Sequence, residues 1–557
     1  MTKLGAFAVT VVAAGTAAAP ATAAAPPAHD ARAGATRTYV VLYARGASLA
    51  GAHRAIHRAG GRILRENRRI GLATVAARSR GFVRRATAAA AIQGAAANRA
   101  IGHLPGLPPW RRIESERGYA ATRRTTARAA DAPPPAEPLS ANQWDMRMMH
   151  ATPDGSYAVQ TGSHAVRVGI IDTGVDGSHP DISPNFDREL SRNFTVDDPV
   201  IDGPCEDEPD HSCTDPPDVD EDGHGTHVAG TIGAALNGVG IGGVAPGVDI
   251  VNLRAGQDSG FFFLQPTVDA LTYAGDNGID VVNMSFFVDP WLYNCRDNPA
   301  DSPAEQEQQA TIIDATQRAL DYARRRGVTL VAALGNENTD LGNPTVDETS
   351  PDYPPGTERP RQIDNSCLDM PTEGRGVIAV ASLGPSERKA YYSNYGLEQT
   401  DVSAPGGDRR DFFGTDRYNA PDNRILAPMP EGVAQAELAA DPSNPLIVQD
   451  CTGGTCAHYQ WLQGTSMASP HAAGVAALIV AEFGKKDPEH GGLTLAPSRV
   501  RDILERTAAR HACPDPNPFT YPDPDLTPDF TATCEGEAKF NGFYGHGIVD
   551  ALDAVVG

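Results

Sequence analysis

Residues 166–174 read Val-Arg-Val-Gly-Ile-Ile-Asp-Thr-Gly, an apolar run that ends in a carboxylate and a turn signal. A short aliphatic run with this ending is typical of a buried β-strand. Similar runs recur along the chain and alternate with stretches of helical length. The predicted strands are residues 166–172, 248–255, 279–286, 328–336, 377–383 and 400–404, and the predicted helices are residues 224–236, 266–276, 307–326, 467–483 and 497–507. This alternation predicts an α/β fold with a mainly parallel sheet covered by helices on both faces, in three layers (αβα).

Two further motifs place reactive side chains at the starts of predicted helices. Residues 223–230, Gly-His-Gly-Thr-His-Val-Ala-Gly, bring His224 to one helix start, and residues 464–470, Gly-Thr-Ser-Met-Ala-Ser-Pro, bring Ser466 to another. Alone, a serine at a helix start is commonly an N-cap, and an aspartate after a strand is commonly a turn residue. A serine hydroxyl becomes a nucleophile when a base lies beside it. Together with Asp172, the two motifs therefore predict nucleophilic catalysis.

These three blocks, in the order Asp, His, Ser, resemble those of the subtilisin family of serine endopeptidases, from about residue 140 to the C-terminus. The resemblance implies that Ser466 is the nucleophile, His224 its general base and Asp172 the group that orients the histidine. It also implies that the side chain of Asn336, which follows the run 329–334, donates to the oxyanion. We expect polypeptide substrates and no cofactor in the chemistry.

The resemblance also implies where substrate lies. One edge is the segment 256–260, including Ser259 and Gly260, and the other follows Ser285. This chain has Phe286-Phe287-Val288 where the family usually has small glycines after that serine and one further residue, so Phe287 is a predicted pocket residue. We therefore expect slower cleavage after large aromatic residues.

A structural calcium ion is a further expectation. Gln143, Asp181 and Asn237 match the family's calcium ligands, and backbone carbonyls of residues 235, 239 and 241 would complete an oxygen cage. Three other patterns are rejected as sites. The glycines of residues 238–243 lie between a helix and a strand, the reverse of a dinucleotide site; residues 218–223 start like an EF-hand but are interpreted as a solvated acidic loop; and His227 is interpreted as a packed helix residue, not a zinc ligand.

Charge divides the chain into a basic front and an acidic body. Residues 31–130 hold 20 arginines and three acidic residues, a net charge of +17, which leaves −40 for residues 131–557 of a chain whose total is −23. The overall charge argues against nucleic acid and membrane surfaces as partners. The basic piece has strand-like residues 38–42 and 70–76 and helix-like residues 49–59 and 82–97. It resembles the family's inhibitor-type propeptide, a small α/β unit that assists folding and blocks the cleft.

The predicted organisation is a signal peptide at residues 1–25, the propeptide at 26–102, a linker with the maturation site at 103–140 and the peptidase domain at 141–557. Lys3, the apolar residues 6–19 and Ala-Thr-Ala at 21–23 support the signal and predict a secreted protein. No membrane span is predicted after residue 30. Eight cysteines in an exported chain predict four disulfides, paired in order along the sequence. Six of them lie in four expected surface insertions at about residues 197–222, 287–306, 338–375 and 406–462.

Two alternative functions were considered. A catalytically silent homologue that binds peptides is favoured by the Phe287-Val288 departure and opposed by the intact catalytic blocks. A serine esterase of the α/β-hydrolase type requires Gly-x-Ser-x-Gly, but residue 468 is alanine and the chain order differs.

Overall fold

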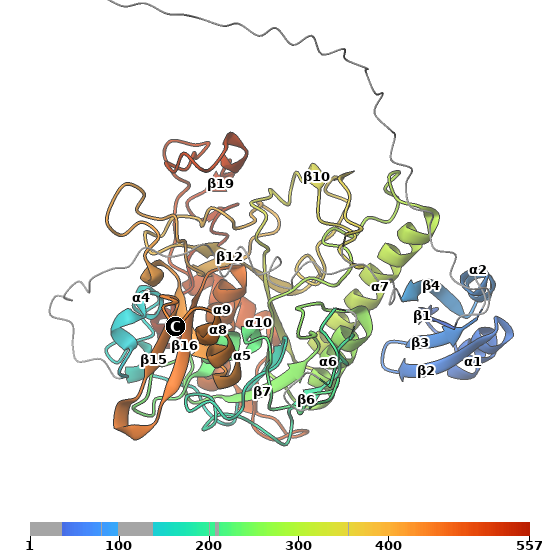
Figure 1. Ribbon diagram of the computed structural model, residues 1–557, viewed down its shortest axis with the longest axis horizontal. Coiled ribbons are helices and arrows are strands. Elements are labelled where there is room, and N and C mark those ends of the chain that lie inside the picture. Colours follow the sequence, from blue (N-terminus) through green and yellow to red (C-terminus); the bar gives the residue numbers. More distant parts are fainter. Residues whose placement is uncertain (1–35, 79–80, 99–136, 200, 207–210, 355) are drawn as a thin grey trace, which may run out of the picture.

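The centre of the molecule is a seven-stranded sheet (Figure 1). The computed structural model describes residues 36–78, 81–98, 137–199, 201–206, 211–354 and 356–557. The strand order is β13-β12-β9-β8-β5-β7-β6, and each pair of neighbours runs parallel. The strands are β5 (Arg167–Ile171), β6 (Arg192–Asn193), β7 (Asp249–Arg254), β8 (Val281–Met284), β9 (Thr329–Ala333), β12 (Val377–Leu383) and β13 (Val402–Pro405). The predicted parallel sheet is confirmed, and the short edge strand β6 was not predicted.

Helices cover both faces of this sheet. One face carries α5 (His224–Gly233), α9 (Thr465–Phe483), α10 (Pro497–Thr507) and α11 (Ala551–Val556), and the other carries α6 (Leu264–Asp276) and α7 (Pro303–Arg325). Successive residues of a strand point to opposite faces. Ile170 therefore lies in the core under α9, whereas Ile171 lies in the core under α6 and α7. The predicted three-layer αβα architecture is confirmed.

Residues 37–98 form a second, smaller unit around an antiparallel sheet in the order β2-β3-β1-β4. Its elements are β1 (Arg37–Tyr43), α1 (Leu49–Arg58), β2 (Gly61–Asn67), β3 (Leu72–Ala77), α2 (Phe82–Thr87) and β4 (Ile92–Asn98). The helix predicted over residues 82–97 is wrong beyond Thr87. Alanine favours helices locally, but pairing with β1 and burial of Ala95 and Ala96 make residues 92–98 a strand.

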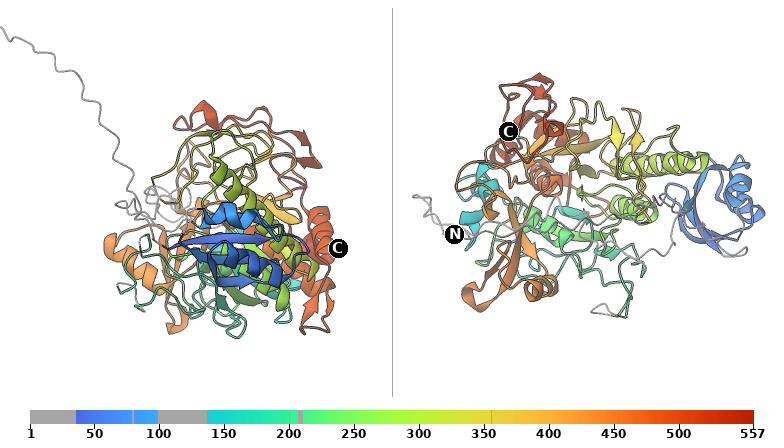
Figure 2. Two further views of the ribbon diagram at one scale, coloured as in Figure 1. Left: turned by 90° about the vertical axis from the view of Figure 1, so that its right-hand side faces the viewer. Right: turned by 45° about the horizontal axis from the view of Figure 1, so that its top comes forward.

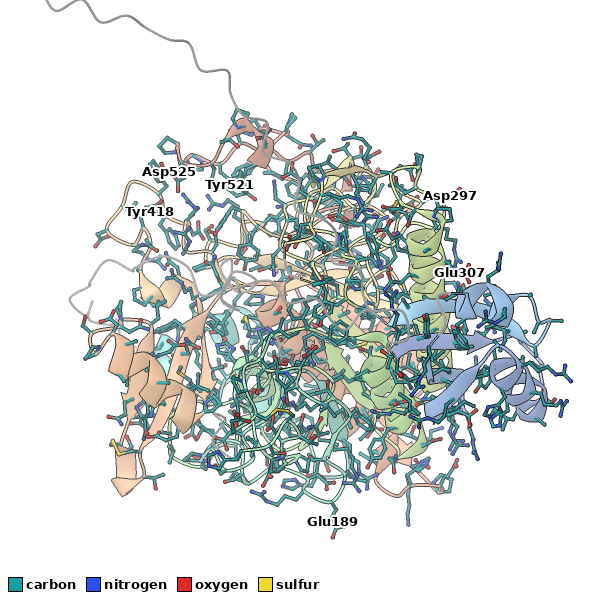
Figure 3. All side chains as sticks on the ribbon, turned by 45° about the vertical axis from the view of Figure 1, so that its right-hand side comes forward. Glu189, Asp297, Glu307, Tyr418, Tyr521 and Asp525 are labelled. Atoms are coloured by element: carbon teal, nitrogen blue, oxygen red, sulfur yellow. A yellow bond between two sulfur atoms is a disulfide. The ribbon has the colours of Figure 1, made fainter. Side chains whose placement is uncertain are left out.

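The small unit packs against α6 and α7 at one end of the molecule (Figure 2). Asn67 Nδ2 donates to Asp269 Oδ1 at 2.8 Å, and Arg65 forms an ion pair with the same carboxylate at 2.5 Å. The Ala95 N–H donates to Glu307 Oε1 at 3.2 Å (Figure 3). Acidic side chains of both helices thus receive donors of the basic unit.

The segment 406–462 is more ordered than predicted. β14 (Ile425–Met429), β15 (Ile447–Asp450) and β16 (Ala457–Leu462) form an antiparallel sheet in the order β14-β16-β15, with α8 (Glu431–Ala440) against β16. The prediction of a surface insertion is wrong for β14 and β16, because Leu426, Tyr459 and Trp461 are buried in a hydrophobic cluster, whereas most residues of 431–449 are exposed or half-buried. Short elements complete the fold: α4 (Trp144–Met148), β10 (Val346–Asp347), β11 (Arg361–Gln362), β17 (Lys485–Lys486), β18 (Leu493–Thr494), β19 (Gly536–Glu537) and β20 (Phe540–Asn541).

The disulfides pair in order along the sequence, as predicted. They are Cys205–Cys213, Cys295–Cys367, Cys451–Cys456 and Cys513–Cys534. The second joins two predicted insertions, 287–306 and 338–375, which are far apart in the sequence.

The helix α9 is long and apolar enough to cross a membrane, but 83% of its most apolar window is buried inside the protein. It is therefore a core helix, which packs under the central sheet. The predicted signal peptide and residues 103–136 of the predicted linker lie outside the described residues.

Candidate active site

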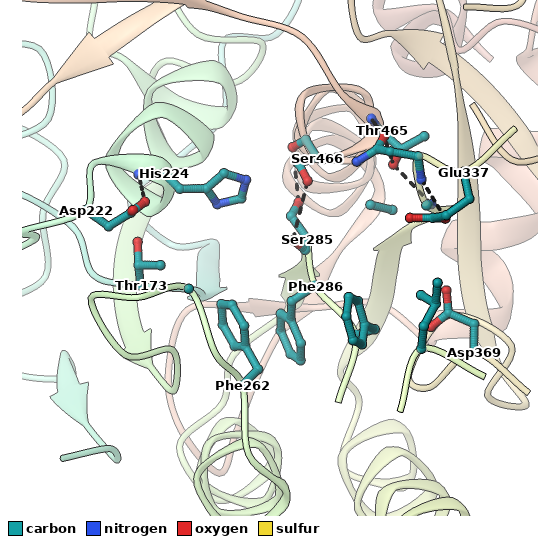
Figure 4. Close-up of a pocket in the computed structure, with 16 residues that line it drawn as sticks. Thr173, Asp222, His224, Phe262, Ser285, Phe286, Glu337, Asp369, Thr465 and Ser466 are labelled. Carbon is teal, nitrogen blue, oxygen red and sulfur yellow. Dashed lines mark hydrogen bonds between the residues drawn. The ribbon is translucent and has the colours of Figure 1, made fainter. Parts of the chain in front are cut away.

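Three predicted catalytic side chains meet at the carboxyl end of the central sheet. Asp172 follows β5, His224 opens α5, and Ser466 lies in the first turn of α9. His224 Nδ1 and Asp172 Oδ1 are 2.7 Å apart, and both side chains are buried. The imidazole of His224 points toward Ser466, and these two residues line one pocket (Figure 4). The Ser466 hydroxyl donates a long hydrogen bond of 3.4 Å to the Ser285 carbonyl oxygen, a contact weak enough for the side chain to rotate.

The close approach of α5 to the end of β5 requires a glycine. A Cβ at Gly225 would lie 2.0 Å from the Gly174 carbonyl oxygen. The helix start is held by the buried Asp220, which accepts from the Gly223 N–H at 3.0 Å and from the Thr226 N–H at 2.9 Å. Burial raises the pKa of Asp220 to about 6. The solvated acidic loop predicted over residues 218–223 is therefore wrong for Asp220, and its position just before a helix start was the missed capping signal.

Asn336 lies immediately after β9 and shares the pocket with the serine. Its Oδ1 accepts from both the N–H and the hydroxyl of Thr465, each at 2.9 Å. These two bonds fix the amide, so its Nδ2 donor faces away from Thr465. The Ser466 N–H belongs to the first turn of α9, where backbone donors have no partner within the helix. The two donors can stabilise an oxyanion formed beside the serine.

His227 is a packed helix residue, as predicted. Its Nε2 lies 3.2 Å from the Ile425 carbonyl oxygen and 3.1 Å from that of Gln460. Burial lowers the pKa of His227 to about 3, so the ring is neutral at physiological pH. It joins α5 to the sheet of β14 and β16.

The sequence model of the Subtilase family matches residues 163–547, which is more than half of the chain. The chain belongs to the subtilase family. Its relatives include the thermophilic serine proteinase of Bacillus sp. (strain AK1), 29% identical over 356 residues that cover 64% of this chain and 59% of that protein. Subtilisin DY of Bacillus licheniformis is 28% identical over 343 residues, which cover 62% of this chain and 83% of that protein.

Solved structures agree with the subtilase fold. The epidermin leader peptide processing serine protease EpiP from Staphylococcus aureus has a TM-score of 0.60 at 22% identity, and the match covers 94% of this chain and 98% of that chain. Fervidolysin from Fervidobacterium pennivorans has a TM-score of 0.55 at 22% identity, with 95% of this chain and 62% of that chain covered. The thermophilic proteinase and EpiP are named a serine proteinase and a serine protease, respectively.

The pocket of this subtilase contains three of the four predicted substrate residues. Gly260, Ser285 and Phe287 line it, whereas Ser259 does not. The Ser259 N–H instead donates to Asp202 Oδ1 at 2.8 Å, because the insertion at 197–222 packs against this segment. At the predicted substrate edge 256–260, the N–H of Ser259 therefore already donates a hydrogen bond within the protein.

Three carboxylates that line the pocket were not predicted there, namely Asp222 beside His224 and two on the opposite wall. Glu337 and Asp369 line its wall on the side opposite His224 (Figure 4). Glu337 directly follows Asn336 in the sequence. The predicted role of Asn336 beside the nucleophile could therefore have suggested that Glu337 also lies in the pocket. Asp369 comes from the 338–375 insertion, and no motif in the sequence marks it.

The three predicted calcium residues gather around the loop 239–242, where Gln143 Oε1, Asn237 Oδ1 and Asp181 Oδ2 accept hydrogen bonds, whereas Asp181 Oδ1 is buried without a partner among the described residues. Gln143, Asp181 and Asn237 each accept a hydrogen bond from an N–H of this loop, at 3.3, 3.1 and 2.9 Å. The Tyr459 hydroxyl donates to Asp181 at 2.8 Å, and burial raises the pKa of that carboxyl to about 7. Calcium prefers ionised carboxylates and free oxygens, and Asp181 Oδ1 is the one side-chain oxygen of these three residues that the arrangement leaves free. The calcium site stays a prediction.

A second acidic cluster is paired with an arginine side chain of the protein. Among the described residues, the ligand oxygens of Asp197, Asp215 and Asp258 lie within 4.8 Å of one another. The buried guanidinium of Arg254 forms ion pairs with all three. The arginine thus supplies the positive charge at this site.

Proposed function

We propose that this subtilase is a serine endopeptidase that hydrolyses polypeptides through an acyl-enzyme. The observation that supports the proposal best is the buried Asp172–His224 pair, 2.7 Å apart, in the pocket that also holds Ser466. His224 removes the proton from the Ser466 hydroxyl as it attacks the carbonyl carbon, and then gives that proton to the leaving amine. Asp172 holds the imidazole in the required tautomer and stabilises the imidazolium. The Asn336 amide and the Ser466 N–H stabilise the oxyanion. Water then releases the acyl group by the same proton transfers.

The chain is also proposed to be made as a secreted, self-processing proenzyme. Residues 26–102 would act as folding aid and inhibitor, with cleavage within residues 103–140. The packing of the basic unit on α6 and α7, with an ion pair at Asp269 and a hydrogen bond at Glu307, supports an intramolecular partner. Two relatives, NisP of Lactococcus lactis at 29% identity and EpiP of Staphylococcus epidermidis at 27%, are named leader peptide-processing proteases. This supports polypeptides as the substrates.

Labelling with a fluorophosphonate probe tests the enzyme against a catalytically silent peptide-binding homologue. We expect covalent labelling of the purified protein at Ser466 and a fall in kcat of about 10⁶-fold in Ser466→Ala, the scale known for subtilisin, a member of this family. The control is Ser443→Ala, because Ser443 is exposed and outside the pocket. Peptide binding without labelling or cleavage would instead establish the silent homologue.

A further inference from the structure

The proposed mechanism uses none of the three carboxylates that line the pocket, of which Asp222 lies beside His224 and Glu337 and Asp369 lie on the opposite wall. The pocket encloses about 150 Å³ and also contains Ser466 and Ser285. His224 gives its proton to the leaving amine, so the wall opposite His224 faces the acyl side of the scissile bond, and the side chain there is that of the residue before the bond. Glu337 and Asp369 therefore face that side chain.

Asp369 is a buried acid without a partner. Its side chain is 2% exposed, and its Oδ1 makes no hydrogen bond. Among the described residues, no arginine, lysine or histidine forms an ion pair with it. An ionised carboxylate is costly to bury without a partner. Burial, Glu373 and Glu337 together raise the pKa of Asp369 well above its usual range. A cation brought into the pocket would remove this cost.

The backbone on both sides of Asp369 is fixed, so the carboxylate does not turn away freely. The Val288 N–H donates to the Met370 carbonyl oxygen at 2.7 Å, and the Leu368 N–H donates to that of Asn294 at 2.9 Å. A disulfide joins the same two segments two residues before Asp369. The carboxylate is thereby held in the wall of the pocket.

The rest of the pocket suits a long aliphatic stem. Phe286, Phe287 and Leu292 line it, and the ring of Phe286 stacks on that of Phe262 at 4.1 Å. Apolar sides with an acidic end match lysine and arginine, which bury their methylene stems and keep the charged head on a polar partner. Hydrogen bonds between a guanidinium or ammonium and a carboxylate are about twice as strong as neutral ones.

We propose that this pocket binds the cationic side chain of an arginine or lysine before the scissile bond, with Asp369 as its counter-ion and Glu337 as a second acid at the more exposed rim. This specificity rests on the proposed function, since it describes the substrate of the same site.

Matched peptides that differ at that one residue test the assignment. We expect kcat/KM for arginine to exceed that for citrulline, its neutral isostere, by about 10- to 100-fold, and lysine to exceed norleucine similarly. In Asp369→Asn the arginine-to-citrulline ratio should fall at least about tenfold, through slower arginine cleavage. Glu348→Gln is the control, because Glu348 is exposed in the same insertion and does not line the pocket, and its ratio should equal that of the wild type.

Fluorophosphonate labelling of each protein separates the possible failures. A labelled wild-type enzyme that cleaves after citrulline and norleucine as fast as after arginine and lysine overturns the pocket assignment and leaves the proposed function intact. Absence of labelling and of all cleavage overturns the proposed function, and the pocket assignment with it. If Asp369→Asn does not fold, the wild-type ratios alone still decide.

Discussion

The two sides of the active-site pocket are built in different ways. On the catalytic side, Asp172, His224 and Ser466 lie at the ends of core strands and helices, within short glycine-rich motifs. The opposite wall combines Glu337, which follows β9 and Asn336, with residues of the insertions 287–306 and 338–375, which are held together by backbone pairing and a disulfide. The core thus positions the chemistry, whereas inserted loops position the groups that would select the substrate. Such a division allows specificity to change while the catalytic geometry stays constant.

The largest effect is expected on the catalytic side, in Asp172→Asn. The asparagine amide keeps the geometry but favours the wrong histidine tautomer, so kcat should fall about 10⁴-fold. The measurement is steady-state kinetics with the arginine peptide, accompanied by thermal unfolding to show that the variant is folded. If the catalytic side does not select the substrate, the residual activity keeps the wild-type ratio of kcat/KM for the arginine peptide to kcat/KM for the citrulline peptide.

The matched control for this substitution is Asp176→Asn. Asp176 lies four residues further along, and its Oδ1 accepts from the N–H and hydroxyl of Ser178 rather than from the histidine. Its kcat should remain within a few-fold of the wild type. An equal loss in both variants would mean that the region tolerates no substitution and would contradict a specific role for Asp172.

The same division explains how much the sequence could predict. Short-range patterns predicted the central strands, and the family resemblance of three motifs predicted the catalytic roles of Asp172, His224 and Ser466. Each of these motifs places its side chain at a strand end or a helix start. Residues 92–98 were predicted as helix because their strand forms through pairing with β1, which lies about 50 residues earlier. Asp369 was missed for a similar reason: its place in the pocket depends on pairing with residues 288–295, and no local motif carries that information.

An intermediate effect is expected when the pocket wall is loosened by replacing Cys295 and Cys367 together with serine. This disulfide closes a loop with a sequence separation of 72, so its removal should destabilise the protein by about 4 kcal/mol in the chain-entropy model. The arginine-to-citrulline ratio should fall, since Asp369 is no longer held, while fluorophosphonate labelling at Ser466 persists. Chemical denaturation and the peptide assay measure the two effects.

The comparison variant replaces Cys451 and Cys456, whose disulfide has a sequence separation of 5 and lies between β15 and β16. Its smaller loop predicts a loss of about 2 kcal/mol, and its distance from the pocket predicts an unchanged ratio. A selectivity loss of equal size in both variants would show that the wall residues respond to general instability, and the proposed role of the Cys295–Cys367 bridge would be withdrawn.

The smallest effect is expected from chelation. Because Gln143 Oε1, Asp181 Oδ2 and Asn237 Oδ1 accept hydrogen bonds from the protein, EDTA should shift the Tm by less than about 1 °C, a change that corresponds to under about 1 kcal/mol for a domain of this size. Tyr459→Phe should instead destabilise the protein by about 1 kcal/mol, since it removes one of the two donors of Asp181 Oδ2 and leaves the Ile241 N–H. A large drop in Tm with EDTA, restored by calcium and absent in Asp181→Asn, would show that the loop 239–242 rearranges around a metal ion. In that case Asp181 could bind the ion through Oδ1, which has no hydrogen-bond partner among the described residues, while Oδ2 keeps the hydroxyl of Tyr459.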